Sequence, residues 1–297
     1  MNPRYPVYVI SKGRAGTPLT ARFLLRDEVP FKLVIEPQER DAYAAALPEA
    51  DLLVTPFSNL GQGGIPVRNF VWDHALASGH ARHWILDDNI HYVMRRYKAQ
   101  RVYVHSGIAM AVMEQFVDRY ENIAIAGPNY AMFAPDRLKL PPFHLNAHVY
   151  SFLLIKNDLP NRWRGRYNED TDLCLQVLAD GWCTVQMNAF VADKMWTMQM
   201  KGGNTDELYK DDGRLKMARS LERQWPGVVT TIRRYQRPQH NVKDQWKRFD
   251  TPLKRRTDID WNALPPVDEH GMVLKARAEP QGEDTKALWM EHNVKRE

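Results

Sequence analysis

Short apolar runs alternate with longer amphipathic segments over residues 1–90. The apolar runs predict strands at 7–10, 31–35, 51–55 and 84–87. The segments between them have apolar residues at helical spacing and predict helices near 20–26, 39–46 and 67–78. Strands and helices that alternate in this way favour an α/β fold with a mostly parallel sheet and covering helices.

The pattern is looser in the rest of the chain. It predicts helices at 106–120 and 170–180, strands at 123–126 and 148–155, and a loop or lid at 128–146. From about residue 205 the sequence is basic and irregular. We therefore predict a large domain at 1–205 and a basic C-terminal region at 206–297 that packs on it.

The composition is that of a folded protein, with 44% hydrophobic residues, nine Trp and twelve Tyr. No run approaches the roughly 18 to 20 apolar residues that span a bilayer, and the first residues do not resemble a signal peptide. The two cysteines, Cys174 and Cys183, are too few for a disulfide framework. These features predict a protein of the cytoplasm.

Positive charge is concentrated near the C-terminus. Residues 214–256 contain thirteen Lys or Arg against three acidic residues, a net charge of +10 in a chain whose total is +5. Aromatic residues lie among these cations, which suits binding to phosphates and stacking on a base. The pattern favours a nucleic-acid partner, and a solvated helix face is the alternative. The candidate DNA-binding residues are Arg233, Arg234, Arg237, Lys247 and Arg248.

Two acidic residues and an amide, Asp87, Asp88 and Asn89, directly follow the apolar run 84–86, so that Asp87 stands at the carboxyl end of the predicted strand. The carboxyl ends of strands are where ligands bind in open α/β sheets. Oxygen donors of this kind suit Mg²⁺ or Mn²⁺. A simple turn after the strand is the alternative, because Asp and Asn also favour chain reversal.

A second acidic pair, Glu169 and Asp170, stands at the start of a predicted helix. Acidic residues there are ordinary dipole chemistry, and a carboxylate facing a pocket can also serve as a general base. Upstream, His144 and His148 are four residues apart, but the strand-like run that follows argues against a shared zinc ion.

A glycine pair occurs in the segment Lys201, Gly202, Gly203. Paired glycines let the backbone approach a phosphate closely, and the lysine adds a donor. We predict a loop that closes over a diphosphate, with a plain flexible turn as the alternative.

Together these motifs resemble the nucleotide-sugar glycosyltransferases of the GT-A fold, and more narrowly the phage TET-associated glycosyltransferases. The resemblance is carried by Val9 to Arg14, by Arg68 and Asn69 after a Gly-rich segment, by the Asp-Asp-Asn motif and by Glu169 and Asp170. It implies that Ser11, Arg14, Arg68, Asn69 and Asp87 bind the donor.

The resemblance also implies the catalytic roles. Asp87, Asp88 and Asn89 occupy the family's Asp-X-Asp position, where the neutral Asn89 replaces the final Asp and weakens metal affinity. Asp170, with Glu169 as its neighbour, takes the position of the catalytic base. His240 is the candidate for a further metal ligand near the end of the core.

The implied function is metal-dependent transfer of a sugar from a UDP-sugar to 5-hydroxymethylcytosine in DNA, with inversion. The resemblance implies Mn²⁺ or Mg²⁺, and no sequence feature points to an obligate protein partner. Two alternatives stay open: a GT-A transferase for a glycan, protein or small molecule, and a non-catalytic DNA-binding protein with a degenerate transferase fold.

Overall fold

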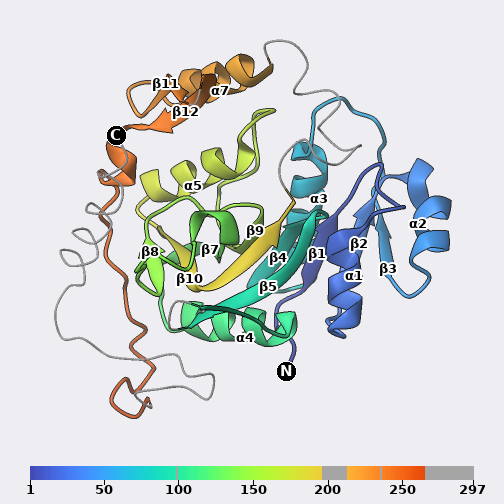
Figure 1. Cartoon of the computed structure of the whole chain (residues 1–297), viewed down its shortest axis with the longest axis horizontal. Coiled ribbons are helices and arrows are strands. Elements are labelled where there is room, and N and C mark those ends of the chain that lie inside the picture. Colours follow the sequence, from blue (N-terminus) through green and yellow to red (C-terminus); the bar gives the residue numbers. More distant parts are fainter. Residues whose placement is uncertain (98–99, 196–212, 235, 265–297) are drawn as a thin grey trace.

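The computed structural model describes residues 1–97, 100–195, 213–234 and 236–264. A central ten-stranded sheet has the order β3-β2-β1-β4-β9-β7-β10-β5-β6, and β8 pairs with β10 beside this path. Helices cover both faces of the sheet (Figure 1). The predicted α/β class is therefore confirmed.

The first half of the sheet is parallel and is built from consecutive β-α units. Its strands are β1 (Val7–Ile10), β2 (Lys32–Ile35), β3 (Asp51–Val54) and β4 (Arg82–Asp87). They are connected by α1 (Leu19–Arg26), by the short η1 (Pro37–Glu39) with α2 (Arg40–Ala46), and by α3 (Ile65–Ala77). The register aligns Val9 with Leu33 on one side and with Leu86 on the other. The elements predicted for this part of the chain are all present.

The second half of the sheet is mixed. β9 (Phe152–Lys156) runs antiparallel between β4 and β7 (Ile123–Tyr130). β10 (Cys183–Lys194) lies parallel to β7 and antiparallel to β5 (Ile90–Tyr97).

The remaining elements of this half complete it. They are β6 (Gln100–Tyr103), α4 (Ser106–Val117), η2 (Ala131–Phe133), β8 (Phe143–Leu145) and α5 (Glu169–Ala179). The segment predicted as a loop at 128–146 thus contains the end of β7, η2 and β8, so that expectation was wrong in part.

The apolar core lies on both sides of the sheet because strand side chains alternate. On β4, Trp84 and Leu86 point into the cluster covered by α1, α2 and α4, whereas Ile85 points into the cluster covered by α3 and α5. All three side chains are fully buried. The strand that ends at Asp87 is therefore held firmly from both faces.

The C-terminal region packs on α5 through a small apolar cluster. It contains α7 (Gly213–Gln224), the hairpin of β11 (Val229–Arg234) and β12 (Arg237–Val242), and η3 (Lys243–Trp246). Leu221 of α7 and Val229 and Val242 of the hairpin bury their side chains against Leu175 of α5. Within the described residues, no helix has the length and apolar character to cross a membrane. No observation tests the predicted boundary at residue 205.

Candidate active site

Asp87 lies at the carboxyl end of β4 and holds two cations. Its Oδ1 accepts a hydrogen bond from Arg68 Nη2 at 2.8 Å, and its Oδ2 accepts one from Lys194 Nζ at 2.8 Å. Burial alone would raise the pKa of Asp87, but Lys194 and Arg68 hold it well below its usual range. The carboxylate is therefore ionised and is shared between α3 and the end of β10.

The turn after Asp87 is anchored by the start of α1. The Thr20 hydroxyl donates to the Asp87 carbonyl at 2.6 Å, and the Thr20 amide donates to the Asp88 carbonyl at 3.2 Å. The buried Asp88 side chain turns to the loop after β1, where it accepts a hydrogen bond from Ser11 Oγ at 2.6 Å and pairs with the Arg14 guanidinium. Asp88 therefore holds the Ser11–Arg14 loop in place.

Arg68 connects this strand end to the start of α5. Its side chain is 5% exposed, lies with its guanidinium carbon 4.8 Å from the Trp163 ring centroid, and has Nε 3.4 Å from Glu169 Oε1. Nε and Nη1 are buried and have no hydrogen-bond partner among the described residues, and Nε keeps only its ion-pair contact with Glu169. Such donors are costly to leave unpaired. They are available to an anionic ligand.

Asn69 has a different environment. Its amide donates to the Trp163 carbonyl at 2.9 Å and accepts from the Trp163 amide at 3.1 Å. These two bonds fix the segment that leads to α5, and they place Trp163 beneath Arg68. The predicted contact of Asn69 with a donor stays a prediction.

The acidic pair opens α5. Asn168 adopts a left-handed conformation, with φ of 54°, and the helix begins at Glu169. Asp170 Oδ1 accepts a hydrogen bond from the Thr171 amide at 2.7 Å, and Oδ2 lies 3.3 Å from His148 Nε2. Burial alone would raise the pKa of Asp170, but His148 and the Thr171 amide hold it below its usual range. Burial raises the pKa of Glu169.

Two histidines surround Thr171, next to Asp170. His148 Nε2 lies 3.3 Å from Thr171 Oγ1, and His240 Nε2, from β12, lies 3.5 Å from the same oxygen. Burial, together with His148, lowers the pKa of His240 to about 4. The hairpin therefore reaches the start of α5, directly beside the candidate base.

Aromatic rings form a row from Phe133 to Trp246 along this site. Tyr150 stacks on Tyr130 with ring centroids 4.5 Å apart, and Phe133 lies 5.3 Å from Tyr150. His148 lies 4.4 Å from Tyr150 and is parallel to the Trp246 ring at 6.0 Å. Phe133 is 51% exposed, so one end of this aromatic row is open to solvent.

The donor set of the Asp-Asp-Asn motif does not fit a divalent cation. Both carboxylate oxygens of Asp87 face cations, and both of Asp88 bond Ser11 and Arg14. Asn89 Oδ1 is buried and has no hydrogen-bond partner within the described ranges. Over the described ranges, no three His, Cys, Asp or Glu side chains could hold a metal ion, so His240 as a metal ligand stays a prediction.

The structure brings most of the predicted site residues together and adds others. Arg68, Asp87 and Glu169 form one contact chain, while Ser11, Arg14 and Asp88 form another. Lys201, Gly202 and Gly203 lie outside the described residues. Sequence reasoning missed Lys194 and the part that His148, Tyr150 and Trp246 play beside Asp170.

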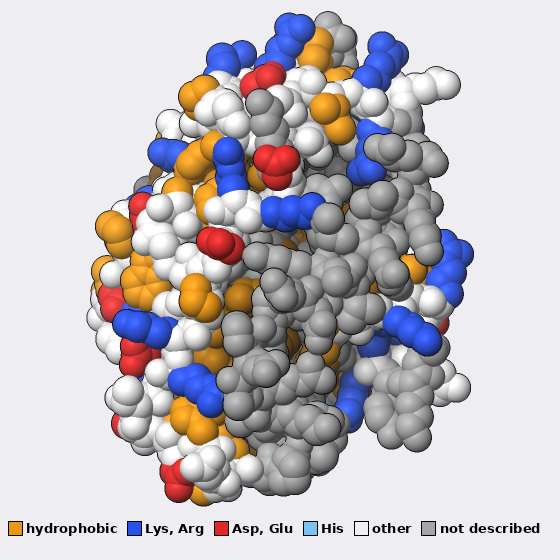
Figure 2. Space-filling model, turned by 90° about the vertical axis from the view of Figure 1, so that its left-hand side faces the viewer, with side chains coloured by type: hydrophobic (Ala, Val, Ile, Leu, Met, Phe, Trp, Pro, Cys, Tyr) orange, Lys and Arg blue, Asp and Glu red, His pale blue; other side chains and the backbone are white. Residues whose placement is uncertain are grey.

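The predicted DNA-binding residues are exposed and cluster on the C-terminal region. The hairpin tip carries Arg233, Arg234 and Arg237, and Arg234 of β11 is the strand partner of Arg237 of β12. Lys247 and Arg248 follow η3. In Figure 2, Lys and Arg side chains gather at the upper end of the face, the level at which α7 and the hairpin lie in Figure 1.

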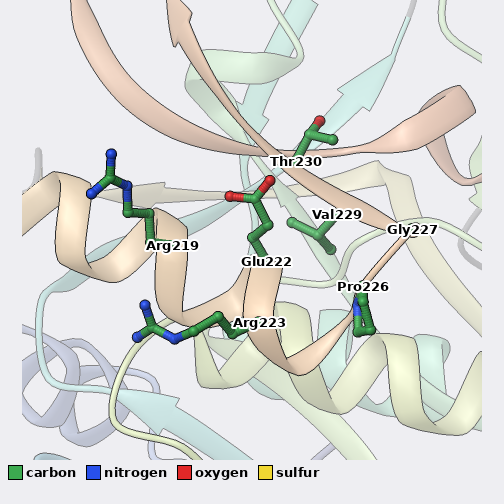
Figure 3. A pocket seen from close by; sticks show the side chains of 7 residues that line it. All are labelled: Arg219, Glu222, Arg223, Pro226, Gly227, Val229 and Thr230. Carbon is green, nitrogen blue, oxygen red and sulfur yellow. The ribbon is translucent and has the colours of Figure 1, made fainter.

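Beside the hairpin, a pocket of about 600 Å³ adds further positive charge to the C-terminal region. Its lining includes Arg219, Glu222 and Arg223 of α7, together with Val229 and Thr230 of β11 (Figure 3). Arg219 and Arg223 are exposed and one helical turn apart. The pocket belongs to the basic surface and does not include Asp87 or Asp170.

Comparisons with known proteins identify the family of the chain. No curated protein matches the sequence. One solved structure that matches is described as mannose-1-phosphate geranyltransferase from Thermus thermophilus. It is 13% identical with a TM-score of 0.31, and the match covers 64% of this chain and 57% of that one.

The family comparison covers most of the chain. The model of the TET-Associated Glycosyltransferase family matches residues 5–203, which include β1 to β10 and α5 and therefore both Asp87 and Asp170. His240 of β12 and Trp246 of η3 lie outside the matched residues. The chain therefore belongs to the TET-associated glycosyltransferase family.

Proposed function

We propose that the protein transfers a sugar from a UDP-sugar to the hydroxymethyl group of 5-hydroxymethylcytosine in DNA, with inversion at the anomeric carbon. The observation that carries the proposal is the contact chain Asp87–Arg68–Glu169, with Asp170 next in sequence. It joins the strand end at which α/β proteins bind ligands to a carboxylate suited to a general base.

The donor is proposed to bind at the β4 end. The Ser11–Arg14 loop, held by Asp88, contacts the uridine, and Nη1 of Arg68, which has no hydrogen-bond partner among the described residues, binds the diphosphate. Asp87 keeps the Arg68 guanidinium oriented at 2.8 Å. A role for Lys201 to Gly203 over the diphosphate stays a prediction.

The acceptor is proposed to bind along the aromatic row. A flipped cytosine needs a flat surface for stacking, and Phe133 offers 51% of its surface for such contact. The same row includes His148, whose Nε2 is 3.3 Å from Asp170 Oδ2. In the proposed complex the base lies along the row with its hydroxymethyl group toward Asp170, while the exposed hairpin arginines contact phosphates.

In the proposed reaction the hydroxymethyl oxygen bonds to the anomeric carbon as the bond from that carbon to the β-phosphate oxygen breaks. The electron pair of the broken bond leaves with UDP, and the hydroxyl proton passes to Asp170. The hydroxyl becomes acidic only as the new bond forms, so a carboxylate of low basicity is sufficient. His148 stabilises Asp170 in the ionised form that accepts the proton.

The test is transfer from a panel of UDP-sugars to DNA containing 5-hydroxymethylcytosine, with nucleosides analysed by mass spectrometry. The expected result is a mass gain of a hexose or N-acetylhexosamine, and D170N should slow it by roughly 10²- to 10⁴-fold. UDP affinity of D170N should stay near that of the wild type. D41N, at an exposed carboxylate of α2, is the matched control.

Other outcomes separate the alternatives. Transfer to a glycan, protein or small molecule, with no DNA modification, would replace the proposed acceptor. DNA binding without any UDP-sugar turnover, and without an effect of D170N, would indicate a degenerate transferase.

A further inference from the structure

Lys194 is a nearly buried cation at the end of the longest strand of the sheet. Its side chain is 14% exposed. Nζ donates to Asp87 Oδ2 at 2.8 Å and to Ser151 Oγ at 2.6 Å, and it lies 5.3 Å from the centroid of the Tyr130 ring. A buried ammonium is expensive unless it is paired and hydrogen-bonded. These contacts satisfy that need and fix the position of Nζ.

A second buried cation lies on the other oxygen of the same carboxylate. Arg68 is 5% exposed and bonds Asp87 Oδ1 at 2.8 Å, while its Nε and Nη1 have no hydrogen-bond partner in the described part of the chain. One carboxylate thus orients two permanent positive charges. A divalent ion at Asp87 would be repelled by both of them and would have to displace at least one from the carboxylate.

We propose that Lys194 and Arg68 supply the positive charge that stabilises the departing diphosphate, so that the transferase needs no divalent ion. The inference rests on the proposed function, because it concerns the same leaving group. As the bond from the anomeric carbon to the β-phosphate oxygen breaks, the electron pair stays on that oxygen. The added negative charge is met by the Lys194 ammonium and by the Arg68 guanidinium, whose Nη1 has no hydrogen-bond partner among the described residues.

The orientation of the two cations explains the role of Asp87 in this arrangement. Preorganised donors stabilise a developing charge without reorganisation during the reaction. Asp87 and Ser151 hold Lys194, while Asp87 and Trp163 hold Arg68. In this arrangement Asp87 positions the cations and does not bind a metal.

The experiment compares turnover and UDP binding in excess EDTA and in Mn²⁺, with protein stripped of metal. The wild type should bind UDP by calorimetry in EDTA and keep its turnover to within about twofold. K194A should lose roughly 10²- to 10³-fold in turnover, as when an oxyanion donor is removed, and should bind UDP more weakly in EDTA. K194R should recover part of both losses because it retains the charge.

K156A is the matched control. Lys156 ends the neighbouring strand β9 and pairs with the exposed Asp158, so its removal should leave turnover and UDP affinity unchanged. Thermal unfolding of each variant shows whether it is folded. If K194A does not fold, K194R and the EDTA series on the wild type still decide the question.

Loss of turnover or of UDP binding in EDTA, with recovery in Mn²⁺, would overturn the inference. Absence of UDP binding in both conditions would overturn it as well. UDP binding in EDTA that K194A weakens and K156A does not, without sugar transfer to DNA, would sustain the cation pair and refute the proposed acceptor.

Discussion

Gly127 lies where β7 and β9 approach most closely, and replacing it by alanine should disrupt the sheet beside the site. A Cβ at this position would lie 2.1 Å from the Phe152 carbonyl oxygen and 2.8 Å from Val149 Cγ1. The first contact is with backbone, which cannot rotate away as a long side chain can. β7 and β9 would have to separate by about 1 Å to restore a normal contact.

The energetic cost follows from that separation. Overpacking of a well-packed core costs about 1–3 kcal/mol, and a backbone clash in the sheet should fall at or above the upper figure. At about 3 kcal/mol the unfolding temperature of a chain of this size should fall by roughly 5 °C. The shift of β9 would also move Ser151 away from Lys194, so turnover of the folded fraction should decrease.

The assay is thermal unfolding followed by circular dichroism, with G16A as the control. An added Cβ at Gly16 meets no atom within 4 Å, and the backbone there is not left-handed. G16A should therefore unfold within about 2 °C of the wild type, since such changes cost or gain less than about 1 kcal/mol. Equal unfolding temperatures for G127A and G16A would refute the close approach of the two strands.

Two further predictions concern the C-terminal hairpin. R233A/R234A should weaken DNA binding and reduce the slope of log K against log salt by roughly 2. The control R22A/R40A, at exposed arginines of α1 and α2, should leave the slope unchanged. Equal slopes for both variants would place the DNA elsewhere. His240 should make folding acid-sensitive, because its pKa falls from 6.5 to about 4 on folding. The stability due to the neutral ring is complete above pH 6.5 and is lost as pH falls toward 4, by about 3 kcal/mol in total. H240Q should therefore lose less stability than the wild type between pH 7 and pH 4 in urea unfolding, and identical losses would contradict the burial of His240.

The acidic positions of the site could be predicted from local patterns. Asp87 follows a short apolar run that favours a strand, and Asp170 lies in the first turn of a helix with apolar residues at helical spacing. Each of these patterns is complete within about a dozen residues. The α/β alternation then places the end of β4 at the ligand-binding edge of the sheet.

Lys194 could not be predicted because the strand that carries it does not look like one. β10 buries Thr184, Gln186 and Asn188, which are polar. Their side chains bond backbone carbonyls of the segment 141–148, and Gln186 reaches the His148 carbonyl at 2.6 Å. The buried polar residues that make β10 difficult to predict are thus the same ones that hold the segment carrying His148.

The hairpin could not be predicted for a related reason. Among its described residues it buries Val229 and Val242, which pack against Leu221 and the distant Leu175. Isolated hairpins are marginal in water, so its stability depends on α5 and α7. The charge of the segment was evident in the sequence, whereas its docking beside Asp170 was not.

The order of strands in the sheet has a consequence for how the protein folds. β1 to β4 pair in a unit that is contiguous in the sequence, and this unit contains Asp87 and Arg68. Asp170 and Lys194 reach the site only when β9 pairs with β4, with Arg82 opposite Lys156, and β10 pairs with β5, with Phe190 opposite Arg95. Closing such long loops costs more chain entropy than local pairing. The two halves of the candidate active site therefore come together at the slow, non-local steps of folding. Partial unfolding that releases β9 and β10 would separate them while the first half of the sheet is still formed.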